Sequence, residues 1–186
     1  DTAYQIVFSP PKPPFTRAAK QRILFSHGGH GMKIKNTKTD ILLNIAAVAC
    51  LAAVTLYLLV RWSQIPMTIP GHYTADGQID SWTPRTTLWQ LPVLGWVLYV
   101  LITILEQFPG IWNTGVTVTE ENRTTVYRTL KTMIGWVKLA MSALLSLVAL
   151  ASLGNGYKIF LVLAAVGLLA TFGLVIYFVC RLLQLK

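Results

Sequence analysis

Charged residues are scarce in this chain of 186 residues, and most of those present are basic. Only 12% of the residues are charged, whereas soluble domains carry about 25%. The 16 Lys and Arg outnumber the 7 Asp and Glu, and hydrophobic residues make up 54% of the chain, with a mean hydropathy of +0.55. This composition argues against a soluble domain and favours an integral membrane protein.

Cysteine and histidine are also rare, which limits disulfide and metal chemistry. The chain has 2 Cys and 3 His. Cys50 and Cys180 fall in different apolar runs and at different expected depths, too far apart for the Cα spacing of a disulfide, so we expect free thiols. His27 and His30 flank two glycines, a pattern with too few ligands for a metal. We therefore predict no metal site and no cofactor.

Four hydrophobic runs are each long enough to cross most or all of a bilayer. A helix rises about 1.5 Å per residue, and the hydrocarbon core is about 30 Å thick. The predicted spans are 41–60, 88–105, 134–153 and 159–180. The sequence thus predicts an all-α membrane protein, a four-transmembrane-helix bundle formed by residues 32–186, with the lipid bilayer as its first partner.

Lysine and arginine are distributed unevenly between the predicted loops, which predicts the orientation. One side, with both termini, holds Lys33, Lys35, Lys38, Arg123, Arg128, Lys131, Arg181 and Lys186. The other side holds Arg61, Arg85 and Lys158. We expect both termini in the cytoplasm and residues 65–85 outside.

Charges are nearly absent from the predicted spans. Lys138 is expected near the start of the third span, where its side chain snorkels to the interface. No charged residue lies at the middle of a predicted span, which removes the usual marker of an ion pathway and argues against a coupled transporter. The basic excess forms no cluster that would track phosphates on a soluble surface, so nucleic acid is not a predicted partner.

Residues 1–31 differ in composition from the rest of the chain. They contain a proline cluster within 10–14 and no sustained apolar period, so we expect a flexible segment. Two glycine codons can spell a bacterial ribosome-binding sequence, and Gly28 and Gly29 precede Met32 by two codons. Two interpretations remain: Met32 is the natural start and residues 1–31 are not native, or the segment is a genuine tail. Mass spectrometry of the native N-terminal peptide distinguishes them.

The polar passage 65–85 between the first two spans predicts a short extracytoplasmic β-hairpin. Asp76 and Gly77 suit a two-residue type I′ turn, which requires positive φ at both positions. The expected pairs are Ala75 with Gln78, Thr74 with Ile79, Tyr73 with Asp80 and His72 with Ser81. Because side chains alternate along a strand, His72 and Asp80 are expected on opposite faces. That arrangement favours structural or recognition roles over a metal or acid–base site.

The passage 106–133 carries a second signal. Thr117 or Thr119 can cap a new helix, and Val126, Leu130 and Met133 recur at helical spacing. We expect an amphipathic helix along the inner surface that leads to the third span. It has two interpretations, an anchor on anionic lipid or a docking surface for a cytoplasmic partner.

Two motifs resemble those of a known family. Residues 69–85, read as IP-x-HY-x-x-x-G-x-x-D-x-W-x-x-R, are similar to the signature of the small membrane domain of unknown function 1648. Residues 112–131, WNTGVTVTEENRTTVYRTLK, are similar to the Thr-Glu-Glu-Asn stretch of that family. The candidate binding or structural residues are Pro70, His72, Gly77, Asp80, Trp82, Arg85, Asn113, Glu120, Glu121 and Asn122.

The resemblance implies a multi-pass protein of the bacterial cytoplasmic membrane. In some proteins this domain precedes an immunity module against a sporulation-delaying toxin. Our leading prediction is a non-enzymatic protein that acts by association with a membrane or cytoplasmic protein, in regulation, envelope stress or toxin immunity. The alternatives are an accessory subunit of a membrane transporter complex, and a membrane enzyme that uses His72 and Asp80. Affinity purification in mild detergent separates these readings.

Overall fold

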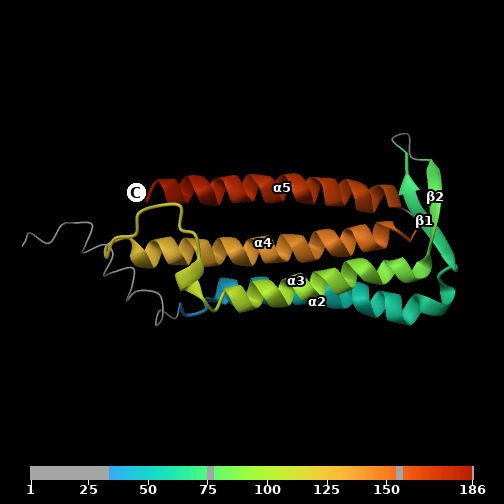
Figure 1. Cartoon of the computed structure of the whole chain (residues 1–186), viewed down its shortest axis with the longest axis horizontal. Coiled ribbons are helices and arrows are strands. Elements are labelled where there is room, and N and C mark those ends of the chain that lie inside the picture. Colours follow the sequence, from blue (N-terminus) through green and yellow to red (C-terminus); the bar gives the residue numbers. More distant parts are fainter. Residues whose placement is uncertain (1–33, 75–77, 154–156, 186) are drawn as a thin grey trace, which may run out of the picture.

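The computed structural model describes residues 34–74, 78–153 and 157–185. These residues form four long helices and one two-stranded sheet (Figure 1). The helices are α2 (Lys38–Arg61), α3 (Gln90–Leu105), α4 (Arg123–Ala151) and α5 (Tyr157–Leu183), and the strands are β1 (Thr68–Tyr73) and β2 (Ile79–Pro84). Short 3-10 turns are η1 (Trp62–Gln64), η2 (Arg85–Trp89) and η3 (Pro109–Ile111). The segment 1–31, Met32 and the expected turn at Asp76 and Gly77 lie outside the described residues.

Each of the four helices is long and apolar enough to cross a bilayer. The candidate spans are Lys38–Gln64, Arg85–Leu105, Arg123–Ala151 and Ile159–Leu183. Together with the antiparallel pair of β1 and β2, they make the chain an all-α four-helix membrane protein with a small hairpin. This fold class is the one that the apolar runs predicted. Cys50 and Cys180 are both free.

Helix α4 is the central element of the bundle. It packs extensively against α2, α3 and α5, whereas α5 has its extensive contact with α4 (Figure 1). Small residues allow the close approach of α2 and α4: the Ser146 hydroxyl donates to the Cys50 carbonyl at 3.1 Å, and Gly135 faces Leu43. Close packing through small residues is the usual means of association between helices in a membrane.

The hairpin lies at one end of the bundle, and the start of α2, the start of α4 and the end of α5 lie at the other (Figure 1). Helix α2 begins at a capping box, because Thr37 and Asp40 satisfy each other's backbone N–H groups. This cap places the helix start before residue 41, where the uninterrupted apolar run begins. The hairpin motif, residues 69–85, and the second motif, residues 112–131 around the start of α4, thus lie at opposite ends of the molecule (Figure 1).

Helix α4 begins at Arg123, well before the predicted span 134–153. The expected amphipathic helix is thus the first part of one continuous helix that contains the third predicted span, and it runs along the bundle with the rest of α4 (Figure 1). Val126 and Leu130 are buried with Leu182 of α5 in one apolar cluster. The stripe at helical spacing therefore packs within the protein instead of on lipid.

Candidate functional site

The hairpin pairs in a register that differs in part from the expected one. His72 lies opposite Ser81, as predicted, but Tyr73 lies opposite Ile79 and not Asp80. The backbone N–H of Thr74 donates to the Gln78 carbonyl at 2.9 Å, so Thr74 does not face Ile79. The register shifts twice, because Gly71 is an extra residue in β1 and Asp80 is an extra residue in β2.

The bulge at Asp80 brings its carboxylate to His72. The His72 Nδ1 atom lies 2.7 Å from Asp80 Oδ1 and 2.9 Å from Oδ2. The expectation that the two side chains project from opposite faces is therefore wrong, because a bulge interrupts the strict alternation of a strand. The pair is solvent-exposed, with 68% of the His72 side chain and 42% of the Asp80 side chain accessible.

The contact with Asp80 orients the His72 ring. It occupies Nδ1 and leaves Nε2 as the ring nitrogen for a proton, a metal or a hydrogen-bond donor. Within the described ranges, no three His, Cys, Asp or Glu side chains are grouped as a metal site would require. The pair can therefore serve as an oriented hydrogen-bonding group, and a partner would have to supply any further ligand.

Arg85 fixes the base of the hairpin. Its guanidinium donates to the carbonyls of Trp62 at 2.9 Å and Ile65 at 2.8 Å, and it stacks on the Trp62 ring with a 4.8 Å separation. Its backbone N–H also donates to the Met67 carbonyl at 2.9 Å. One side chain thus ties the chain that leaves β2 to the chain that enters β1. A planar guanidinium can make both contacts together, which an ammonium does less well.

The two faces of the hairpin differ in burial. Ile69 is buried with Leu58, Ile65 and Leu88 in a cluster that attaches the sheet to the helices. Trp82 lies opposite Pro70 in the register and is 63% exposed. Ile79 and Met67 are also exposed. The hairpin therefore has an anchored base at Ile69 and exposed apolar side chains, of which Trp82 lies on the opposite face from Ile69.

The second motif shapes the chain ahead of α4. The Asn122 side chain accepts from the Thr119 N–H at 2.8 Å and donates to the carbonyls of Thr117 at 3.0 Å and Leu185 at 2.8 Å. Asn113 accepts from the N–H of Gly115, whose φ is +66°. The sequence contained no signal for the link to Leu185, because the partners are 63 positions apart.

The candidate residues thus divide into two groups. Pro70, His72, Asp80, Trp82 and Arg85 lie at the hairpin end, and Asn113, Glu120, Glu121 and Asn122 lie at the opposite end. Gly77 lies outside the described residues. Glu120 and Glu121 are exposed. The structure does not bring the nine described residues together as one site, and in the hairpin group the side chains of His72 and Asp80 converge.

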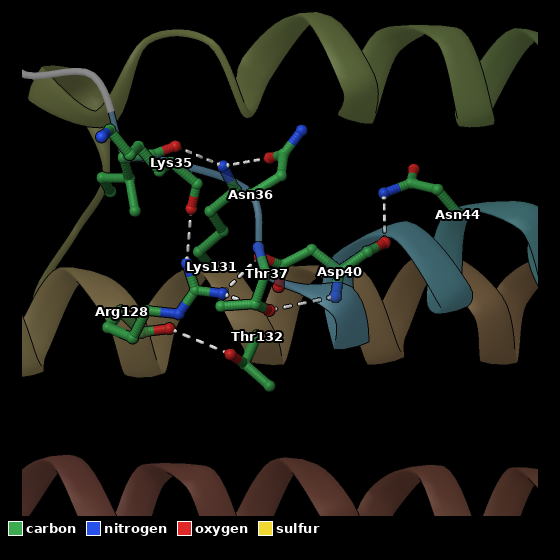
Figure 2. A network of polar contacts seen from close by, with 9 residues as sticks. Lys35, Asn36, Thr37, Asp40, Asn44, Arg128, Lys131 and Thr132 are labelled. Atoms are coloured by element: carbon green, nitrogen blue, oxygen red, sulfur yellow. Dashed lines mark hydrogen bonds and ion pairs between the residues drawn. The ribbon is translucent and has the colours of Figure 1, made fainter.

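A polar network that the sequence did not reveal joins α4 to the start of α2 (Figure 2). Arg128 donates to the Lys35 carbonyl and the Thr37 hydroxyl, each at 2.7 Å, and pairs with the Asp40 carboxylate. Lys131 donates to the Ile34 carbonyl at 2.8 Å. Two of the basic residues that indicated orientation are therefore also structural donors.

A buried ion pair joins α3 to α4. The Lys138 ammonium lies 2.9 Å from the Glu106 carboxylate, and 0% of its side chain is accessible. It also donates to the Thr103 hydroxyl at 3.2 Å and lies 5.0 Å from the centre of the Tyr99 ring. The charge of Lys138 is therefore satisfied within the protein, by a carboxylate that directly follows the last residue of a candidate span, and its snorkelling to the interface stays a prediction.

The family described as Domain of unknown function (DUF1648) has a model that matches residues 49–95. This stretch runs from α2 through the hairpin into α3, so the match includes the first motif and not the second. The chain thus carries this domain, as its hairpin motif indicated, in a membrane protein. No curated protein and no solved structure matches the chain.

Proposed function

We propose that the protein acts by association, and that the exposed face of the hairpin is its recognition surface. The observation that carries this proposal is the contrast between the anchored Arg85 base and the exposed Trp82. An exposed aromatic side chain on a fixed scaffold costs little conformational entropy when a partner covers it. The His72 and Asp80 pair adds a polar group with a defined orientation beside that surface.

The opposite end of the bundle supports docking less well. The apolar stripe at Val126 and Leu130 is already covered by Leu182 and its neighbours. Asn122 is likewise occupied by contacts within the chain. The exposed side chains there include the polar Glu120 and Glu121 as well as the apolar Phe108 and Ile111.

The proposed setting is the bacterial cytoplasmic membrane, with the hairpin outside and both termini in the cytoplasm. Basic residues support this orientation: Lys35, Lys38, Arg123, Arg128, Lys131 and Arg181 belong to the end opposite the hairpin, and Arg61 and Arg85 to the hairpin end. The partner is then a membrane or extracytoplasmic protein or peptide. Regulation, envelope stress and protection from a toxin are all roles of this kind.

The test is affinity purification in mild detergent, followed by identification of the captured protein. Trp82→Ala should reduce the captured partner about tenfold or more, since buried aromatic anchors contribute about 2 kcal/mol or more. Ile111→Ala is the matched control, because Ile111 is 67% exposed at the opposite end and should have no effect. Equal capture by both variants would remove the hairpin from the proposal.

The second candidate is an accessory subunit of a transporter complex, and the exposure of α5 favours it. The most apolar window of α5 is only 6% buried within the chain, so another subunit or lipid covers it. This reading predicts a partner that is lost on Leu169→Trp and retained on Trp82→Ala, because Leu169 is 71% exposed on α5. If the protein is instead an enzyme that uses the oriented His72 ring, a substrate must be turned over, and His72→Ala must abolish that turnover.

A further inference from the structure

The exposed apolar stripe of α3 continues past the end of the helix. On α3 it includes Val97, Leu101 and Leu105, each about half exposed, and after the helix it includes Phe108 and Ile111, which are 56% and 67% exposed. These positions are three or four residues apart, which is the spacing of one helix face. Because a candidate span ends at Leu105, the stripe runs from the membrane-spanning part into the segment that follows it.

The backbone of residues 107–111, which we call the boundary loop, is hydrogen-bonded within the chain. Pro109 has no N–H group, and neighbouring N–H groups donate to carbonyls three residues back at 3.0–3.2 Å: Gln107 to Ile104, Phe108 to Leu105, Ile111 to Phe108, and Trp112 to Pro109. A segment in water can bond to the solvent, whereas a segment that approaches hydrocarbon has to satisfy its polar groups within the protein. The boundary loop therefore meets this condition for contact with lipid.

The sequence around the boundary loop is uncharged. Residues 107–119 contain no Asp, Glu, Lys or Arg, and the next charged residue in the chain is Glu120. Glu106, just before the loop, has its carboxylate 2.9 Å from the Lys138 ammonium, so these two charges are paired with each other. Charged side chains are the costliest ones to bring near hydrocarbon, and this stretch of the chain carries none.

Trp112 closes the boundary loop and joins it to the second motif. Its indole N–H donates to the Leu105 carbonyl at 2.9 Å, and its ring lies 6.2 Å from the Tyr127 ring of α4. It also packs against the apolar cluster that contains Val126. An indole combines an apolar ring with one donor, and such side chains are enriched at membrane interfaces. A contact that holds the boundary loop in place therefore also limits the movement of the second motif.

From these observations we infer that the boundary loop is a lipid-binding anchor. Phe108 and Ile111 insert between the headgroups and the acyl chains of the leaflet at the end opposite the hairpin, at the depth of about 5–10 Å that apolar faces of interfacial segments reach. The ligand is the phospholipid surface, bound through apolar contact, and the anchor holds the second motif at the membrane. The inference does not depend on the hairpin or its partner.

The first experiment measures the depth of the boundary loop by spin labelling. The full chain without its two native cysteines is reconstituted in nanodiscs of phosphatidylcholine and phosphatidylglycerol, and a nitroxide is attached to Phe108→Cys or Ile111→Cys. Collisions of the label with oxygen, which enters the membrane, are compared with collisions with a water-soluble nickel chelate. Both labels should favour oxygen severalfold more than a label on Glu121→Cys, the exposed control at the same end, and less than one on Leu101→Cys of α3.

Three results of this experiment would refute the anchor. Labels as accessible to the nickel chelate as the one on Glu121→Cys would place the boundary loop in water, and labels shielded from both reagents would show that protein covers it. The third result concerns lipid charge. Because the boundary loop is uncharged, its depth should be the same in nanodiscs of phosphatidylcholine alone. A depth that requires phosphatidylglycerol would assign the contact to basic residues of this end, such as Lys35 and Lys38.

The second experiment keeps the native cysteines and measures deuterium uptake of the protein in nanodiscs. The double variant Phe108→Gln with Ile111→Gln removes the apolar contact with lipid, so uptake in residues 113–119 should rise severalfold while that of the hairpin stays the same. Ile79→Gln is the matched control, because Ile79 is an apolar residue, 41% exposed, at the hairpin end, and it should leave residues 113–119 unchanged. If the double variant behaves like this control, lipid contact does not hold the second motif and the anchor is wrong.

Discussion

Arg85 shows how one side chain can hold a short hairpin in place. Its guanidinium contacts two backbone carbonyls and the Trp62 ring, so it substitutes for several separate interactions at the base of a very short sheet. A two-stranded hairpin is marginally stable alone. The surface that we propose for association thus depends on a residue that need not contact the partner.

Arg85→Lys should destabilise the protein despite keeping the positive charge. An ammonium does not combine the ring stacking on Trp62 with the two hydrogen bonds that one guanidinium nitrogen donates. We therefore expect a loss of about 2 kcal/mol, the usual contribution of hydrogen bonds from a charged group. Thermal unfolding in detergent measures it. Thr86→Ala is the control, since Thr86 is exposed beside Arg85. If the Arg85→Lys variant were as stable as the control, the apolar cluster around Ile69 alone would hold the base of the hairpin.

At the scale of the elements, the sequence predicted what depends on local composition. Long apolar runs are sufficient to identify four spans, and they did so for all four helices. A helix ahead of the third span was also predicted, from its cap and its apolar spacing, and α4 does begin at Arg123. The contacts of Arg128 and Lys131 on its first turns were not predicted. Their partners lie on α2 and in the segment before it, about 90 positions away in sequence, and no local pattern reveals such contacts.

The contacts of the candidate site were less predictable for a related reason. The alternation of side chains along a strand predicted His72 and Asp80 on opposite faces of the hairpin. Bulges at Gly71 and Asp80 interrupt that alternation and bring the two side chains together. Two-residue periodicity contains no signal for a bulge. The partners of Lys138 escaped for the same reason as those of Arg128, since Glu106 lies 32 positions away.

The packing of α2 against α4 can be tested at Gly135. A Cβ atom there would lie 3.1 Å from the Leu43 side chain, which is itself buried. Gly135→Val should therefore destabilise the protein by about 1–3 kcal/mol, the usual cost of overpacking. Gly173→Val is the matched control, because nothing lies within 4 Å of that position. Equal unfolding temperatures in detergent for the two variants would contradict a tight α2–α4 contact.

At the scale of the whole molecule, the two ends of the bundle have different chemistry. One end exposes Ile79 and Trp82 of β2. The other concentrates ion pairs, Asp40 with Arg128 and Glu106 with Lys138. Both ion pairs include a residue of the central helix α4, which also packs against α2, α3 and α5.

The orientation of the molecule decides which compartment each end meets, and cysteine labelling tests it. In a variant without Cys50 and Cys180, a cysteine at Ser81 should react with an impermeant thiol reagent on intact cells. A cysteine at Thr125 should react only after permeabilisation, because the basic residues near it favour the cytoplasmic side. Ser81 and Thr125 are both exposed, so a difference in reactivity reports the compartment and not burial. The reverse pattern would move the hairpin into the cytoplasm and make Glu106 face the outside.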